Sequence, residues 1–192
     1  MAIYLTSDLH LNHNRNFIYE SRGFKTISEM NEAIIERFNS TIDWNDDIYI
    51  LGDLCLGGSD SATAEHNQKM LETLNGNIHV ILGNHDTSRR IEMYKQCKNI
   101  VEVSYADMLH YKKYHFYLSH YPTLTSNWDN DKSLKQRVIG LCGHTHTKEP
   151  FADWDKSPIY HVEIDAHDCY PCLLDDAIQE MNEKVYLDKT VK

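Results

Sequence analysis

Short apolar runs recur along the chain, and each ends in a cluster of Asp, Asn, His and Gly residues. The runs lie at residues 2–6, 48–51, 78–82, 115–118, 138–142 and 159–164. Continuous apolar runs are typical of strands buried on both faces, because such strands need a covering layer on each side. The pattern therefore predicts a layered α/β arrangement.

Helical patterns lie between several of these runs. Residues 26–29 have the spacing of a capping box, and an apolar stripe follows at helical intervals. The stripe consists of Met30, Ile34, Ile35, Phe38 and Ile42. Residues 61–74 form a second predicted helix that stops at Asn75-Gly76, and residues 175–181 form a short final helix.

The order of these elements predicts the fold class. Strands and helices alternate in the first half of the chain, and strands dominate the second half. We therefore expect a four-layer α-β-β-α sandwich, an α/β fold of two mixed sheets flanked by helices. Residues 121–137 are polar and are predicted to form a long surface loop facing the substrate. A length of 192 residues suits a single domain, 1–192.

Composition and charge narrow the class of partner. Hydrophobic residues make up 41% of the chain and charged residues 25%, as in ordinary globular proteins. The net charge of −10 repels nucleic-acid backbones, so we expect no binding to duplex nucleic acid and favour a small substrate. Asp8 interrupts the first apolar run too early for a secretory signal or a membrane span. We predict a cytoplasmic protein without a membrane partner; nothing in the sequence indicates its oligomeric state.

The five cysteines are scattered and odd in number, which favours free thiols over a disulfide framework. Cys169 and Cys172 have the C-x-x-C spacing of zinc and redox sites. No second pair accompanies them, so free thiols remain the preferred interpretation.

Five polar clusters carry the chemistry, and each follows a predicted strand directly. They are Asp8-Leu9-His10, Gly52-Asp53, Gly83-Asn84-His85-Asp86, Ser119-His120 and Gly143-His144-Thr145-His146. Loops at the carboxyl ends of strands gather in one place in layered α/β folds, so the clusters are expected to converge. Together they offer carboxylates, an amide oxygen and several imidazoles, which suffice to hold two divalent ions.

In this order, the clusters resemble the pattern D-x-H, G-D, G-N-H-D/E, H, G-H-x-H of the calcineurin-like metallophosphoesterase superfamily. The blocks span residues 8–146, and residues 161–175 resemble the C-terminal part of small bacterial and phage members. The resemblance thus covers nearly the whole chain. It implies hydrolysis of a phosphate ester by a hydroxide that bridges two divalent metal ions.

The resemblance also assigns the metal ligands residue by residue. One ion is expected at Asp8, His10 and His146, the second at Asn84, His120 and His144, with Asp53 as the bridge. A carboxylate suits the bridging position because it has two oxygens to share between the ions. The nitrogen and oxygen ligands, without a thiolate, admit manganese, iron or zinc, and we predict Mn²⁺.

Further roles follow from the same pattern. His85 would be the general acid that protonates the leaving group, and Asn84 would also stabilise the phosphoryl oxygens. Asp86 would assist catalysis by orienting His85. His13 and Arg15 follow the first block directly and are candidate contacts to a phosphate oxygen of the substrate. Guanidinium groups such as that of Arg15 bind phosphate well. Arg15 is equally well interpreted as an ordinary surface residue.

Two departures from the family pattern carry information. Asn12 occupies a place where the family commonly has glycine, and Asn tolerates a positive φ better than most residues. Leu56 and Gly57 stand where phosphoprotein phosphatases carry an acidic residue and an arginine. The second departure argues against a phosphoprotein substrate.

These features favour a phosphodiesterase that acts on a nucleotide-like or other small phosphodiester. A phosphomonoesterase of the same mechanism is one alternative. A non-catalytic metal-binding scaffold of the same fold is another, disfavoured because no predicted ligand is missing. Outside the clusters, His161 and His167 are interpreted as surface residues, and His66, His79, His110 and His115 as surface or structural residues.

Overall fold

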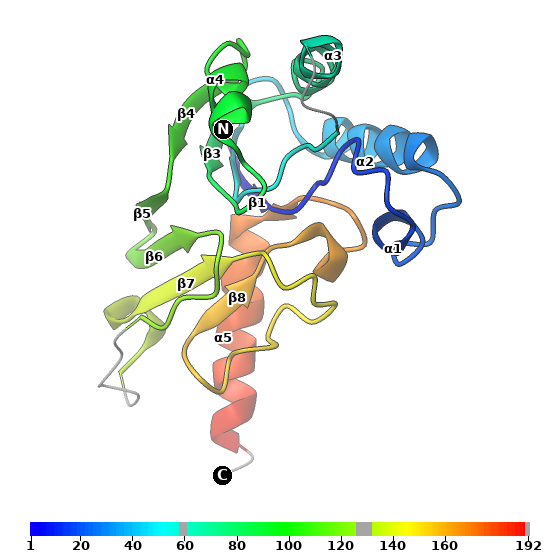
Figure 1. Ribbon diagram of the computed structural model, residues 1–192. Helices are drawn as coiled ribbons and strands as arrows, with labels where there is room; N and C mark the ends of the chain where they lie inside the picture. The colour runs from blue at the N-terminus through cyan, green and yellow to red at the C-terminus, as the bar shows by residue number, and fades with distance from the viewer. Residues whose placement is uncertain (58–60, 126–131, 191–192) are drawn as a thin grey trace.

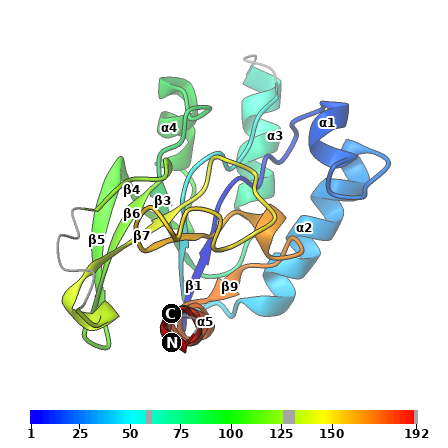
Figure 2. The same cartoon turned by 90° about the horizontal axis from the view of Figure 1, so that it is seen from below.

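Two mixed β-sheets form the centre of the computed structural model, which describes residues 1–57, 61–125 and 132–190 (Figure 1). The first sheet has the strand order β4-β3-β2-β1-β9, and the second has the order β5-β6-β7-β8. Helices flank the sheets (Figure 2). The predicted α/β fold with two mixed sheets flanked by helices is therefore confirmed.

The first sheet is parallel apart from one edge strand. Its parallel strands are β1 (Ile3–Thr6), β2 (Asp47–Ile50), β3 (Asn77–Ile81) and β4 (Ile100–Ser104). The short strand β9 (Cys172–Leu173) pairs antiparallel to β1. The carboxyl ends of the parallel strands consequently meet at one edge of the sheet.

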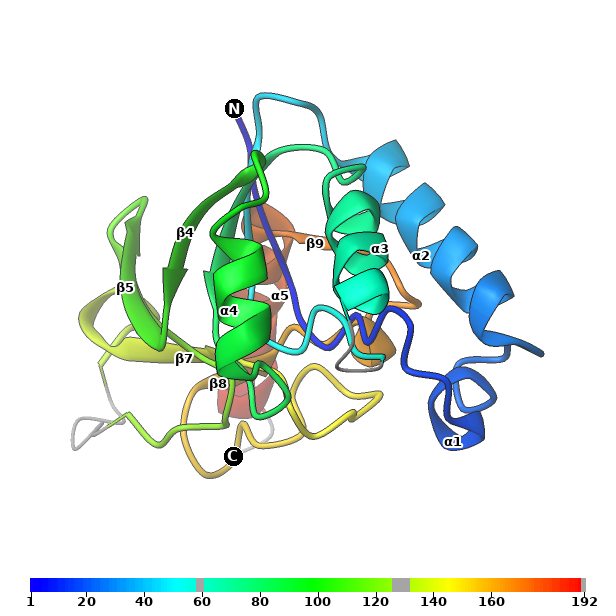
Figure 3. The ribbon, with the colours of Figure 1, turned by 45° about the horizontal axis from the view of Figure 1, so that its top comes forward.

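Three helices cover one face of this sheet, and Figure 3 looks onto that face. They are α2 (Ile27–Thr41), α3 (Ser61–Leu71) and α4 (Ser88–Tyr94). The backbone N–H of Glu29 donates to the Thr26 side chain at 3.2 Å, which caps α2 as the sequence predicted. Met30, Ile34 and Phe38 of the predicted stripe pack in the core under this helix.

A second core joins the opposite face of the first sheet to the second sheet. The second sheet consists of β5 (Ala106–Tyr111), β6 (Tyr114–Ser119), β7 (Val138–Cys142) and β8 (Ile159–His161). Leu5 and Leu51 contribute from the first sheet's side, and Phe116 and Leu141 from the second. The final helix α5 (Leu174–Thr190) packs into the same core through residues such as Met181.

The structure adds elements that the apolar runs did not predict. Strands β4 and β5 are partly exposed, and polar residues such as Glu102, Asp107 and His110 interrupt them, so neither contains a long apolar run. The short helix α1 (Asn16–Tyr19) interrupts the connection from β1 to α2. The predicted loop 121–137 contains a 3₁₀ turn, η1 (Leu134–Gln136), and its residues 126–131 lie outside the described part of the chain.

The cysteines and the helices bear on two further predictions from the sequence. All five cysteines are free, and the preference for free thiols over a disulfide framework is confirmed. Among the helices of the described residues, none has the length and apolarity that crossing a bilayer requires.

Candidate metal centre

The five polar clusters meet at the carboxyl ends of the strands. Asp8 follows β1, Asp53 follows β2 and Asn84 follows β3 in the first sheet, while His120 follows β6 and His144 follows β7 in the second. One set of possible ligands comprises Asp8, His10 and His146, and a second comprises Asp8, Asp53 and His120. The strand topology thus brings together residues separated by up to 138 positions, 8 to 146.

The two carboxylate oxygens of Asp8 differ in their hydrogen bonding. Its Oδ2 accepts hydrogen bonds from Ser7 Oγ at 2.6 Å and from the backbone N–H of His144 at 2.9 Å. Its Oδ1 is buried without a hydrogen-bond partner among the described residues, 3.7 Å from His10 Nε2 and 3.8 Å from His146 Nε2. A buried oxygen left in this way is costly unless a cation or donor satisfies it. These side chains therefore fit a metal ion.

A second group of ligand atoms converges nearby. Asn84 Oδ1 lies 2.9 Å from His120 Nε2 and 2.9 Å from His144 Nδ1, and the two nitrogens are 3.2 Å apart. His120 Nδ1 donates to the carbonyl of Leu51 at 2.8 Å, which leaves the Nε2 lone pair directed at the group. Burial lowers the pKa of His144, which favours the neutral, ligating form.

Asp53 lies between the two groups. Its Oδ2 is 3.7 Å from His10 Nε2 and 3.7 Å from His120 Nε2, while its Oδ1 accepts the backbone N–H of His85 at 2.9 Å. Burial raises the pKa of Asp53, and the nearby charge of Asp8 raises it further. Two buried carboxylates this close need positive charge between them in order to ionise together. The position suits a ligand shared by two cations.

The backbone at these residues is unusual. The φ angles are positive at Asp8 (56°), His10 (50°), Asn12 (61°), Asp53 (56°), His144 (76°) and His146 (51°). A left-handed backbone costs an ordinary residue roughly 1–2 kcal/mol, and such strain clusters at functional sites. Asn12 adopts the positive φ expected of a glycine substitute, so the turn after the first block is retained.

Two glycines of the clusters allow the carboxylates of Asp8 and Asp53 to lie directly against the backbone of neighbouring loops. A Cβ on Gly143 would overlap with Ser7 Oγ and Asp8 Oδ2, and a Cβ on Gly83 would overlap with Asp53 Oδ1. Both glycines are therefore required by close packing against the ligands rather than by their φ angles.

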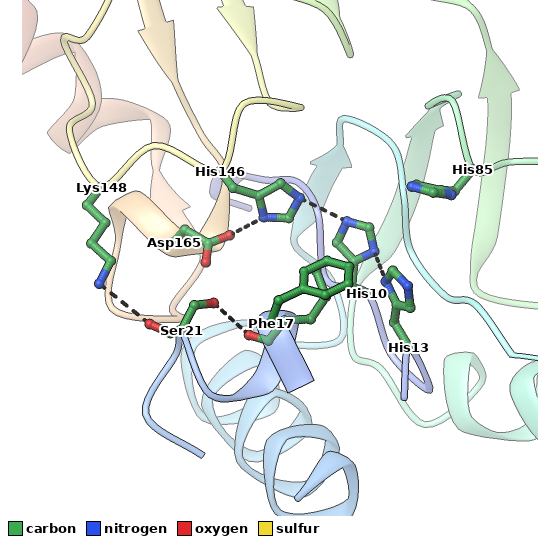
Figure 4. A pocket seen from close by; sticks show the side chains of 9 residues that line it. His10, His13, Phe17, Ser21, His85, His146, Lys148 and Asp165 are labelled. Atoms are coloured by element: carbon green, nitrogen blue, oxygen red, sulfur yellow. Dashed lines mark hydrogen bonds and ion pairs between the residues drawn. The ribbon is translucent and has the colours of Figure 1, made fainter. Parts of the chain in front are cut away.

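Arg22 and Asp165 support the first ligand group, and the cluster pattern did not reveal them. Asp165 Oδ2 lies 2.9 Å from His146 Nδ1, a contact drawn in Figure 4. Arg22 donates to both oxygens of Asp165, at 3.0 and 2.8 Å, and to the carbonyls of Asp8 at 2.7 Å and Leu9 at 3.0 Å. Burial raises the pKa of Asp165, but hydrogen bonds from His146 and Arg22 outweigh it and hold this pKa well below its usual range.

The interpretation of His161 as a surface residue is wrong, because its side chain is fully buried. Its Nδ1 lies 3.2 Å from Glu163 Oε1, and its Nε2 lies 3.0 Å from Asp153 Oδ2. Glu163 Oε1 also accepts the hydroxyl of Thr145 at 2.8 Å, between the two histidines of the last cluster. His161 therefore helps to hold that loop through Glu163.

Asp86 has a different environment from the one predicted. Its Oδ2 accepts the backbone N–H groups of Asp53 at 3.0 Å and Gly83 at 2.7 Å, and its Oδ1 accepts the Tyr94 hydroxyl at 2.6 Å. Both oxygens are thus engaged away from the His85 ring. Asp86 thus ties two cluster loops together, and among the described residues its hydrogen bonds go to groups other than the His85 ring.

The remaining predicted residues lie at different distances from the centre. The His85 side chain is 41% exposed, and its Nε2 lies 4.0 Å from Asp53 Oδ2 at the rim. His13 Nδ1 lies 3.0 Å from His10 Nδ1, and burial lowers the pKa of His13 to about 4. Arg15 is exposed, and it does not line the pocket that His10, His85 and His146 help to form. The structure therefore brings His85 and His13 to the centre, and Arg15 stays outside it.

Known proteins and a family model resemble this chain in sequence and in fold. The family model described as calcineurin-like phosphoesterase superfamily domain matches residues 1–160. An uncharacterized protein of Methanocaldococcus jannaschii is 35% identical over 193 residues, which cover 98% of this chain and 96% of that protein. Among solved structures, a protein of unknown function from Aquifex aeolicus has a TM-score of 0.70 at 20% identity, covering 93% of this chain and 98% of that chain.

A novel archaeal phosphodiesterase is more distant, with a TM-score of 0.46 at 17% identity over 85% of this chain and 82% of that chain. The likeness to the Aquifex aeolicus structure concerns the fold alone. The family model accounts for most of the chain and contains every predicted metal ligand. The chain therefore belongs to the calcineurin-like phosphoesterase superfamily.

Proposed function

We propose that the protein is a dinuclear-metal phosphoesterase that hydrolyses a small, nucleotide-like phosphodiester. One observation carries the proposal. Asp53 Oδ2 lies at 3.7 Å from an imidazole nitrogen of each ligand group. Asp53 also groups with Asp8, whose Oδ1 is buried without a hydrogen-bond partner among the described residues. This arrangement has the form of two adjacent cation sites with a shared carboxylate.

The proposed ligands divide into two groups around that carboxylate. Asp8, His10 and His146 would hold one ion, Asn84, His120 and His144 the other, and Asp53 both. Two divalent ions bound there, for which we propose Mn²⁺, supply Lewis acidity and lower the pKa of water. Iron and zinc fit the same nitrogen and oxygen donors.

His85 is the proposed general acid. In the hydrolysis, the oxygen of water forms a new bond to phosphorus, and the bond from phosphorus to the leaving oxygen breaks. The leaving oxygen takes a proton, and the half-exposed His85 ring at the rim can supply it. An imidazole suits this step because its ordinary pKa lies near neutrality.

The charge of the chain supports a small substrate. A net charge of −10 opposes binding of long nucleic acids, whose affinity depends on neutralising many phosphates. A small phosphate ester carries few charges, so a small binding site with local positive charge is sufficient to hold it. We therefore propose a small phosphate ester as the partner, without duplex nucleic acid.

The replacement Asp53→Asn tests the proposal. Metal-dependent hydrolysis of bis-p-nitrophenyl phosphate should fall by more than about 100-fold, since loss of a mere supporting residue at a metal site already costs about 10–100-fold. Asp175→Asn, which alters an exposed carboxylate paired with Lys112, is the matched control and should keep wild-type turnover.

Elemental analysis of the wild-type protein should find two equivalents of metal. Wild-type turnover in Asp53→Asn, or no stoichiometric metal in the wild type, would refute the assignment. Faster hydrolysis of p-nitrophenyl phosphate than of the diester would instead identify a phosphomonoesterase.

A further inference from the structure

A pocket of about 440 Å³ adjoins the candidate metal centre (Figure 4). Its size lies within the roughly 300–1,000 Å³ of small-molecule sites. His10, His146 and His85 form part of its wall. The rest of the wall includes side chains that the proposed hydrolysis does not use, namely Phe17, Ile18, Ser21 and Lys148.

Phe17 presents an aromatic face to this pocket. It lies in α1, where its neighbour Ile18 is buried in the core and anchors the helix, whereas Phe17 is 69% exposed. The Phe17 ring centroid lies 6.0 Å from that of His13 in an edge-to-face arrangement. A single exposed Phe is ordinary on a protein surface. On a wall shared with the ligand histidines, however, it offers a stacking surface for a planar ring of the substrate.

Lys148 adds a positive charge to the same pocket. Within the described residues Lys148 forms no ion pair, and its Nζ contacts the carbonyl of Ser21 at 3.5 Å. The negative charge of Asp165, also on the wall, is already engaged by Arg22 and His146. In a chain with a net charge of −10, this ammonium is a local attraction for an anionic group such as phosphate.

The order of these groups along the pocket suggests which arm of the ester they bind. In Figure 4, Lys148 and His85 lie at opposite ends of the pocket, and Phe17 lies between them. A general acid acts on the leaving oxygen, so the leaving group belongs at the His85 end. Phe17 and Lys148 consequently face the arm that stays on phosphorus.

We propose that this pocket binds a nucleotide as the retained arm of the substrate, with its base against Phe17 and a further phosphate at Lys148. The inference rests on the proposed function and names the substrate class of that site. Water cleaves the bond from phosphorus to the leaving alcohol, which takes the proton, and the nucleotide keeps the phosphoryl group. The products are an alcohol and a nucleotide with two phosphate groups.

Three p-nitrophenyl esters with one leaving group test this inference. They are methyl p-nitrophenyl phosphate, thymidine 5′-(p-nitrophenyl phosphate), and the same thymidine ester with a 3′-phosphate. In Phe17→Ala, the ratio of kcat/KM for the thymidine ester to that for the methyl ester should fall about tenfold, as loss of a base stack predicts. Phe17→Tyr should retain the ratio.

Lys148→Gln should reduce the kcat/KM advantage of the 3′-phosphate about tenfold, and Lys148→Arg should preserve it. The matched controls lie outside the pocket. Tyr186 on α5 is 69% exposed, the same fraction as Phe17, and Lys95 pairs with Glu92 on the surface. Tyr186→Ala and Lys95→Gln should leave both ratios at the wild-type value.

The outcome separates this inference from the proposed function. If Phe17→Ala and Lys148→Gln keep both ratios within twofold of wild type, the nucleotide pocket is refuted, while hydrolysis of the methyl ester that depends on Asp53 would still stand. If no ester is hydrolysed, the proposed function fails. Calorimetric binding of thymidine 3′,5′-bisphosphate then tests the nucleotide pocket by itself. Tenfold weaker binding in Phe17→Ala supports the pocket, and unchanged binding overturns it.

Discussion

Replacing Asp165 with Asn removes a charge on which a buried guanidinium depends. The side chains of Arg22 and Asp165 are 1% and 6% exposed, and their closest contact is 2.8 Å. Removing one partner of a buried ion pair costs about 3–5 kcal/mol. The amide retains one acceptor oxygen, so we expect a loss in unfolding free energy at the lower end, about 3 kcal/mol. For a domain of this size the melting temperature should fall by about 6–12 °C.

The same substitution should weaken metal binding in the protein that remains folded. The Asp165 carboxylate holds His146 through Nδ1 at 2.9 Å, which leaves His146 Nε2 directed towards Asp8 Oδ1. A carboxylate in this position orients the imidazole and increases its basicity, and its loss typically costs about 10–100-fold in affinity. We expect that decrease for the ion proposed to bind at Asp8, His10 and His146.

Two measurements distinguish these effects. Urea denaturation in the presence of a chelator gives the loss of stability, and calorimetric titration with Mn²⁺ below the melting temperature gives the affinity of the folded protein. Asp175→Asn, at an exposed ion pair, should change neither quantity measurably. If Asp165→Asn loses stability but binds Mn²⁺ with wild-type affinity, then Asp165 does not orient His146, and the reasoning is refuted.

Two further predictions concern acid catalysis and the thiols. His85→Ala should lower kcat/KM more for phenyl esters than for p-nitrophenyl esters, because a stable leaving group needs less protonation; an equal loss on both would indicate a binding role instead. Burial raises the pKa of Cys55 and Cys97 to about 12, so these thiols stay protonated in the folded protein until the pH approaches 12. Ellman's reagent at pH 8 should therefore modify them slowly in the native chain and quickly in urea, and rapid native labelling, mapped by mass spectrometry, would contradict this.

The parts of the fold that the sequence predicted are those with a strong local pattern. Strands β1, β2, β3, β6 and β7 contain short apolar runs whose side chains pack in the two cores. Strand β4 contains the exposed Val101 and Glu102, and β5 contains the exposed Met108 and His110. Partial exposure removes the continuous apolar signal from these two strands, and their pairing depends on neighbours that the local sequence does not specify.

The candidate site shows the same division. Its ligand clusters were recognisable because each is a dense local motif at the end of a strand. Arg22 meets Asp165 across 143 positions of sequence, and no motif surrounds it. Asp86 was recognised by its place in a motif, but its partners Asp53, Gly83 and Tyr94 depend on how the loops pack. Local sequence therefore predicts which groups carry the chemistry, whereas the groups that orient them emerge only from tertiary contacts.

Several candidate ligands lie on backbone of an uncommon conformation. Asp8, His10, Asp53, His144 and His146 all have positive φ. This left-handed conformation is uncommon for residues other than glycine, although Asp, Asn and His adopt it more readily than most residues do. It persists because each strained loop follows a strand locked in the core, as the fully buried Leu5, Leu51 and Leu141 show. The packed sheets therefore help to fix the positions of the candidate ligands.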